Sequence, residues 1–268
     1  MHVYSTFLIA SDSSNLGRLD YDSLSTQALM EIFIAGIENR DVICGSAETP
    51  DDFDKWDGFE YSGERSVEIT EEEFKITWMR LHLVGTIDLQ WLPPAIRWLN
   101  IFENELKGSL NLTALPESME VLDCKNNAFS GEIDLRNLPA EIAYLGLAIN
   151  QLSGSLNLEQ LPQSIRELYL HSNRFSGTVC LRHLPSSLNE LTVSRNKLSG
   201  TVDLTRLPAT LKILWLGGNQ FEGHTDFSQL PDGLDELSVS YTNLSGEITV
   251  GDQTTYFGLQ HSKVQLIE

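Results

Sequence analysis

Histidine and cysteine are the side chains that most often bind metals or act as nucleophiles, and this 268-residue sequence has six of the first and three of the second. None of the histidines has a Cys, Asp or Glu at the spacing of a metal-binding motif. No nucleophile elbow or kinase signature is present, although a Ser-His-Asp site built from distant residues would escape such a search. We therefore expect no enzyme activity, no cofactor and no metal. The histidines are His2, His82, His171, His183, His224 and His261.

Aromatic and basic side chains offer a second kind of chemistry, the recognition of another protein. Exposed Trp and Tyr are over-represented in binding hot spots. The chain is acidic, with a formal charge of −20, but Arg174, Arg195 and Lys197, with His171, form a basic group in the middle turns. This group is expected to lie next to Glu167 and Glu190. This favours an acidic and apolar protein or peptide as partner; the alternative is that the charges pair across neighbouring strands and the rings stack on each other. The candidate binding residues are Trp98, Phe102, Tyr144, Tyr169, His171, Arg174, Arg195, Lys197, Trp215 and Tyr241.

A unit that recurs every 23 residues, between Leu92 and Gly246, must position these side chains. It reads L-P-x-x-L-x-x-L-x-L-x-x-N-x-L-x-G-x-L-x-L, and a degenerate copy precedes the first Leu-Pro. Such fixed self-similarity indicates a solenoid in which each turn contacts only its neighbours. Alternating Leu-x-Leu segments stacked at one per turn predict a parallel sheet. Outward residues of the strands then form columns on one face.

The segment L-x-x-L-x-L-x-x-N-x-L resembles the leucine-rich-repeat family, with the following Gly most similar to its plant-type subclass. The resemblance implies an α/β fold by convention: a right-handed solenoid with a parallel concave sheet, short convex strands, 3₁₀ turns and an N-terminal helical cap. We expect the convex strand to follow the Gly, as Gly-x-Leu-x-Leu, and to end at Leu-Pro because Pro cannot donate to a ladder. The resemblance to this family also implies a protein-interaction scaffold that binds its partner on the concave face. The alternative is a displayed surface antigen or structural repeat protein.

An asparagine recurs where each strand ends. A side-chain amide both donates and accepts, so a buried ladder of amides can satisfy turn backbone that the sheet does not serve. We expect these residues to be structural. They are Asn104, Asn127, Asn150, Asn173, Asn196 and Asn219.

Three segments follow from these patterns: an N-terminal cap over residues 1–70, about eight turns over 71–250, and a C-terminal capping segment over 251–268. Within the cap, apolar spacing predicts a helix over Asp22 to Arg40, capped by Ser23 or Ser25. A second helix is expected to begin at Thr49, and residues 66–70 alternate as a strand does.

Charge and cysteine count bear on partners and compartment. The acidic balance argues against nucleic acid, and no apolar run is long enough to insert into a membrane. Cys44, Cys124 and Cys180 leave an odd count, which favours a reducing, cytoplasmic compartment. The apolar run Val3 to Ala10 lacks a preceding basic residue and is interrupted by Ser5 and Thr6, so it resembles a signal peptide only weakly. A secreted or surface-displayed protein is the alternative to a cytoplasmic one.

Overall fold

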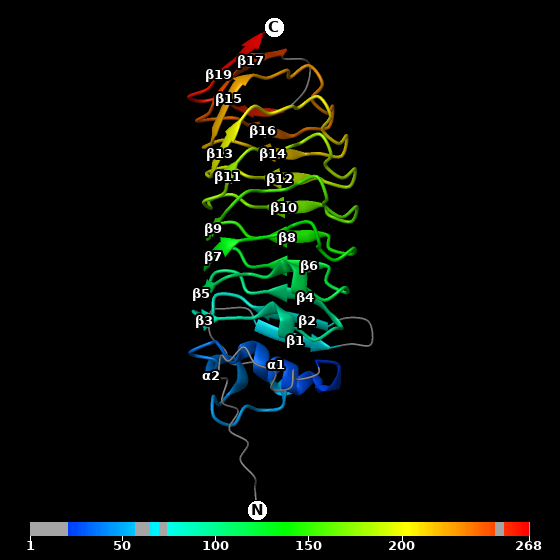
Figure 1. The fold of residues 1–268 in the computed structure, drawn as a ribbon, viewed down its shortest axis with the longest axis vertical. Coiled ribbons are helices and arrows are strands. Elements are labelled where there is room, and N and C mark those ends of the chain that lie inside the picture. Colours follow the sequence, from blue (N-terminus) through cyan, green and yellow to red (C-terminus); the bar gives the residue numbers. More distant parts are fainter. Residues whose placement is uncertain (1–20, 57–64, 70–73, 250–254, 268) are drawn as a thin grey trace, which may run out of the picture.

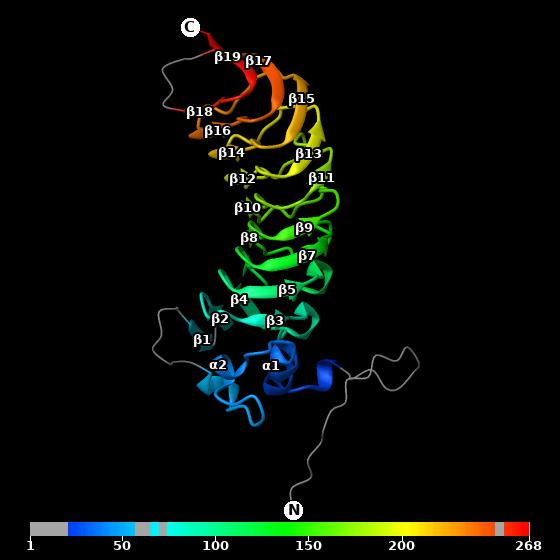
Figure 2. The same ribbon diagram turned by 90° about the vertical axis from the view of Figure 1, so that its left-hand side faces the viewer.

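The computed structural model describes residues 21–56, 65–69, 74–249 and 255–267. The chain winds into a stack of turns, with the helices α1 (Thr26–Ile34) and α2 (Asp41–Cys44) at its N-terminal end (Figure 1). The stack bends, and the larger sheet lies on the inner side of the bend (Figure 2). This is the predicted solenoid. The run Val3 to Ala10 lies outside the described residues.

The inner, concave sheet has 10 strands in the described part of the chain. Neighbours are parallel from β2 onward, and β1 pairs with β2 antiparallel. The strands, in spatial order, are β1 (Arg65–Ile69), β2 (Phe74–Trp78), β4 (Ile96–Asn100), β6 (Val121–Asp123), β8 (Tyr144–Gly146), β10 (Glu167–Tyr169), β12 (Glu190–Thr192), β14 (Ile213–Trp215), β16 (Glu236–Ser238) and β18 (Tyr256–Gly258).

A leucine in each repeated inner strand points into the core. Leu168 is fully buried, and it pairs in register with Leu145 on one side and Leu191 on the other. Because the side chains of a strand alternate between faces, the residues that flank each leucine point to the concave surface. The in-register pairing therefore lines up these outward residues in columns.

The opposite face carries a second set of strands, which form two sheets (Figure 2). The prediction that these strands follow the repeated Gly was wrong, because they end at it or straddle it. Three residues after Gly108, the Asn111 side chain accepts the N–H of Thr113 at 3.2 Å, and the 3₁₀ helix η4 (Leu112–Ala114) begins there. The strands are β3 (Val84–Thr86), β5 (Glu105–Gly108), β7 (Ala128–Glu132), β9 (Gln151–Ser153), β11 (Ser176–Gly177), β13 (Lys197–Gly200), β15 (Gln220–His224), β17 (Asn243–Thr249) and β19 (Lys263–Ile267).

The expected role of Leu-Pro was also wrong. The Pro162 carbonyl accepts the N–H of Ile165 at 3.3 Å, and the other repeated prolines do the same three residues on. Leu-Pro therefore opens the tight turn that leads into the next inner strand. The predicted 3₁₀ turns are present, as η4 and as η3 (Leu89–Trp91).

Each repeated asparagine joins two turns. The Asn150 Oδ1 accepts the N–H of Phe129 at 3.0 Å, and its Nδ2 donates to the carbonyls of Cys124 and Leu147 at 3.0 and 3.1 Å. The same bonds recur at the other five positions. In the last turn, Thr242 donates its hydroxyl to the Val239 carbonyl at 2.7 Å instead.

The N-terminal helices cover the first turn. Ser25 is the N-cap of α1, as predicted, and accepts the N–H of Ala28 at 3.2 Å. Phe33 of this helix stacks on Trp78 with ring centroids 6.1 Å apart. The helix is shorter than predicted because the chain turns at Gly36, whose carbonyl accepts the N–H of Thr86. Among the described residues, no helix has both the length and the apolar character needed to cross a membrane.

The prediction of a helix from Thr49 was wrong. The second helix, α2, lies earlier, and only the 3₁₀ helix η2 (Phe53–Lys55) follows. Tertiary bonds occupy the backbone that a helix would need: Asp51 accepts from the Trp56 indole at 2.7 Å, and Phe53 donates to Gln27 at 2.6 Å.

The sheet continues beyond the eight expected turns. β18 pairs with β16 in parallel, and β19 pairs with β17 through five residue pairs. The C-terminal segment thus adds a strand to each face of the stack.

One residue per turn, at the rim where the inner strand ends, has a left-handed backbone. The side chains in this column are Arg80, Glu103, Asn126, Ile149, Ser172, Arg195, Tyr241 and His261, with φ between 54 and 57°. A β-branched residue is strained in this region, whereas asparagine tolerates it.

Ile149→Asn is therefore expected to raise the free energy of unfolding by about 1 kcal/mol. Ile149 is 46% exposed, so little apolar burial is lost. Chemical denaturation measures the change. Val121→Asn, in the extended strand β6, should not stabilise, and equal effects at both positions would contradict the explanation.

Candidate binding surface on the concave sheet

A band of aromatic side chains crosses the middle of the concave sheet. Tyr144 of β8 lies against Tyr169 of β10, with ring centroids 5.5 Å apart. His171 follows, 6.5 Å from Tyr169 and 6.3 Å from Trp215 of β14. The parallel register brings these four predicted binding residues together.

Lys125 lies at the N-terminal end of this band. Its Nζ is 5.8, 5.1 and 4.9 Å from the ring centroids of Phe102, Tyr144 and Tyr169. It also pairs with Asp123 at 3.2 Å. A cation held by three rings and one carboxylate fixes the rings in place.

The tyrosine hydroxyls are bound to carboxylates. Tyr144 donates to Asp123 at 2.9 Å, and the Tyr169 hydroxyl lies within hydrogen-bond distance of both Glu167 and Glu190. Burial, and then the neighbouring carboxylates, raises the pKa of both tyrosines above its usual value. Around Tyr144 and Tyr169, the two hydroxyls, Lys125 and the carboxylates thus satisfy one another.

His171 is half-buried, and its Nδ1 lies 2.8 Å from the Thr192 hydroxyl. Burial, with the nearby positive charges of Lys125 and Arg195, lowers the pKa of His171 below its usual 6.5. The imidazole is therefore neutral at pH 7.

This lowered pKa predicts a loss of stability in acid. Because His171 takes up its proton at a lower pH in the folded chain, the unfolded chain binds more protons as pH falls through 6.5. Stability should decrease below that pH, down to the folded-state pKa of His171. Thermal unfolding from pH 7 to 5 should show a shallower decrease for His171→Gln than for the native chain; identical slopes would contradict the prediction.

A hollow of about 620 Å³ opens next to this band, toward the C-terminal turns. Its floor is low because small residues occupy the outward positions there: Gly217, Ser238 and Ser240. Its other lining residues include His171, Arg195, Trp215, Glu236, Tyr241, Tyr256 and Gln260.

Two exposed rings and one cation stand at its edge. Tyr241 is 62% and Tyr256 60% exposed. Trp215 is oriented by its indole N–H, which donates to Glu236 at 3.0 Å. Within the described part of the chain, the Arg195 guanidinium makes no ion pair, in contrast to Lys125.

Not every candidate lies near this hollow. Trp98 and Phe102 are on the concave sheet toward the N-terminal turns, where Lys75 lies over Trp98 at 5.8 Å. Lys197 opens β13 on the opposite face. Arg174 donates to Gln151 at 3.0 Å, at the start of β9. Neither of these two basic residues lines the hollow.

The residues of this surface that sequence reasoning missed include Lys125, Tyr256 and Gln260. Lys125 shares the outward column of Phe102 and His171, and that column could have found it. The other two follow a shorter spacing, since Tyr256 pairs with Glu236 only 20 residues earlier.

No protein-family model matches the sequence, and no curated protein matches it. A chain of the PEPR1–AtPEP1 crystal structure is similar with a TM-score of 0.58 and 19% identity, over 90% of this chain and 42% of that one. A plant ice-binding protein aligns with a TM-score of 0.49 and 19% identity, over 90% of this chain and 94% of that one. The plant peptide hormone receptor RGFR1, in complex with RGF2, aligns with a TM-score of 0.47 and 22% identity, over 68% of this chain and 34% of that one.

This chain thus spans less than half the length of those two receptor-complex chains. At such identities the likeness concerns the fold, and it lends no support to the predicted cytoplasmic location. The 23-residue repeat, the parallel solenoid with its bridging asparagines and the likeness to the PEPR1–AtPEP1 chain show that this chain has the leucine-rich-repeat fold.

Proposed function

We propose that this protein is an interaction scaffold that binds a peptide segment of a partner protein in the concave hollow. The observation that carries the proposal is the hollow itself, where exposed aromatic rings surround a floor of glycine and serine. Its volume lies within the roughly 300–1,000 Å³ typical of ligand sites. The neighbouring band of aromatic side chains, held in place by Lys125 and the carboxylates, borders this hollow on the side of the N-terminal turns.

The chemistry of the hollow selects the peptide. Trp215, Tyr241 and Tyr256 provide apolar faces with little entropy to lose, which suits an aromatic or aliphatic side chain. The Arg195 guanidinium can pair with a carboxylate in fork geometry. The partner segment therefore carries an acidic group close to an apolar side chain.

A displayed library of random short peptides, selected on the full chain, tests this proposal. Enriched peptides are expected to place Asp, Glu or a terminal carboxylate next to an aromatic or aliphatic residue. Trp215→Ala should weaken their binding about 30-fold, as expected for a hot-spot residue of roughly 2 kcal/mol. Arg195→Glu should weaken acidic peptides most.

Trp98→Ala is the matched control, because it removes the same side chain from the same sheet outside the hollow. Thermal unfolding shows whether each variant is folded. Peptides that bind the Trp215 variant as well as the native chain would contradict the site. Failure to enrich any peptide would contradict the function and favour a displayed or structural role.

A further inference from the structure

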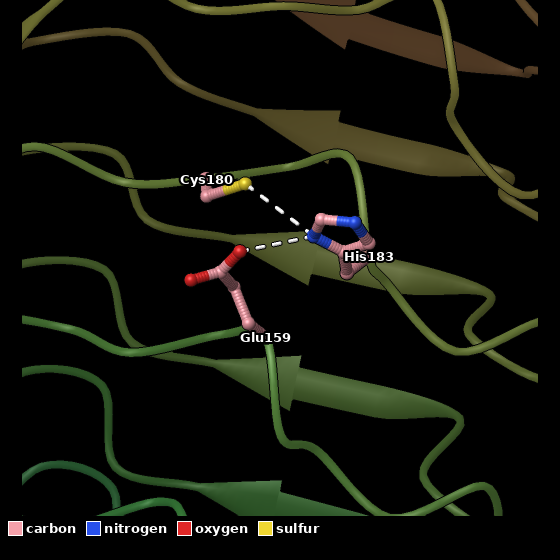
Figure 3. Close-up of side chains that lie close together, drawn as sticks. All are labelled: Glu159, Cys180 and His183. Carbon is pink, nitrogen blue, oxygen red and sulfur yellow. Dashed lines mark hydrogen bonds and ion pairs between the residues drawn. The ribbon is translucent and has the colours of Figure 1, made fainter.

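Three side chains with metal-binding atoms meet on the face opposite the concave sheet (Figure 3). The His183 Nδ1 lies 2.9 Å from the Glu159 carboxylate and 3.8 Å from the Cys180 sulfur. All three donor atoms lie within 4.8 Å of one another. The search for metal-binding spacings in the sequence did not detect this cluster.

The stacking of turns explains how they meet. Cys180 and His183 are three residues apart in the segment after β11, and Glu159 lies in the turn before, after β9. Neighbouring turns are separated by one strand spacing, about 4.8 Å. A sequence search that considers one turn at a time detects only two of the three residues.

Cys180 replaces a structural side chain. In the other turns the equivalent residue is Asp or Asn, whose Oδ1 accepts the N–H two residues on. This holds for Asp88, Asn111, Asp134, Asn157, Asp203 and Asp226, at 2.8 to 3.2 Å. A thiol is a weak acceptor and does not serve this turn. At this position, the repeat exchanges a turn-stabilising group for a soft ligand that faces a histidine and a carboxylate.

The donor set specifies the class of metal. Thiolate and imidazole suit zinc and related divalent transition metals, and they do not suit calcium or magnesium. Ligands at 2.0–2.3 Å from a tetrahedral ion lie roughly 3.2–3.8 Å apart. The distances of 2.9 and 3.8 Å are close to these values. Because Glu159 and His183 are exposed, small side-chain rotations can complete the geometry, and water can take the fourth position.

We propose that Glu159, Cys180 and His183 form a binding site for a divalent transition metal of the zinc class. The site is independent of the concave hollow and links two successive turns of the solenoid. Its ligands are one sulfur, one nitrogen and one oxygen.

Cobalt(II) added to the reduced full chain is the probe. Thiolate ligation gives a sulfur-to-cobalt charge-transfer absorption band, and Cys180 is its only accessible source. Cys44 and Cys124 are both fully buried. We expect the charge-transfer absorption to reach its maximum at one equivalent of cobalt(II) per chain. Zinc(II) should abolish the absorption by displacing the cobalt.

Cys180→Asp is the decisive variant. It restores the side-chain type of the neighbouring turns, so the chain should fold, and it should lose the band completely. His183→Ala should weaken cobalt binding by more than the roughly 10–100-fold typical of an outer-shell partner. His224→Ala removes an exposed histidine from β15 as the matched control and should leave the titration unchanged. Absence of a thiolate band in the native chain, or its persistence in Cys180→Asp, would overturn the proposal.

Discussion

Gly85→Ala is expected to lower the free energy of unfolding by about 3 kcal/mol or more, by separating the N-terminal helices from the first turn. A Cβ on Gly85 would lie 2.2 Å from the Gly36 carbonyl oxygen and 3.0 Å from the Glu38 nitrogen. Backbone bonds join the two segments at this point, from Glu38 to Val84 at 2.8 Å and from Thr86 to Gly36 at 2.9 Å. The estimate combines roughly 1–2 kcal/mol for the positive φ with about 1 kcal/mol for each weakened bond.

Gly177→Ala is the control that separates the cost of the clash with the N-terminal helices from the cost of placing alanine at a positive φ. Gly177 occupies the same column and also has a positive φ, of 80°, but its Cβ would meet only the Ser155 side chain at 3.9 Å. It should cost about 1–2 kcal/mol. Denaturant titrations of both variants make the comparison. Equal losses would show that the contact between Gly85 and the helices contributes nothing.

The repeat made the inner sheet predictable from sequence. A leucine at the same place in each turn can be buried only if the strands stack in register, so the outward columns follow. The second strand was misplaced because apolar residues alternate on both sides of the Gly. After the Gly, an Asp or Asn side chain accepts a backbone N–H, as Asn111 accepts that of Thr113, and holds the chain in a turn. The extended strand is therefore formed before the Gly or across it.

The binding surface was predictable only in part. Tyr144, Tyr169, His171 and Trp215 come together because they follow the repeat. Lys197 was counted as outward, although the chain has already turned toward the opposite face after the asparagine column. The hollow depends on the small residues of its floor, glycines and serines, and on a last strand that departs from the 23-residue spacing.

The left-handed rim could also have been inferred. Asn126 and Gly218 are residue types that favour positive φ, and they share this column with Ile149 and Arg195. A regular bend at one position per turn directs the chain from the inner strand to the asparagine. The asparagine then holds that bend from inside, which makes its amide a link between neighbouring turns.

Asn150→Ala should consequently lower the free energy of unfolding by about 1–3 kcal/mol, the cost of leaving buried backbone groups without partners. The variant removes the acceptor for Phe129 N–H and the donor for the carbonyls of Cys124 and Leu147. The measurement is the denaturation midpoint at constant m-value.

Hydrogen exchange locates the effect. Because Asn150 connects its own turn to the one before, protection should decrease at Phe129 and in β7 and β9, and remain in the distant strand β17. Asn189→Ala is the matched control, since within the described residues its side chain makes no hydrogen bond, and it should change stability by less than about 0.5 kcal/mol. An unchanged midpoint for Asn150→Ala would mean that the turns are held by leucine packing alone. A loss confined to the two neighbouring turns would show that the asparagines couple the repeats pairwise, as expected for a solenoid whose stability is a sum of nearest-neighbour interfaces.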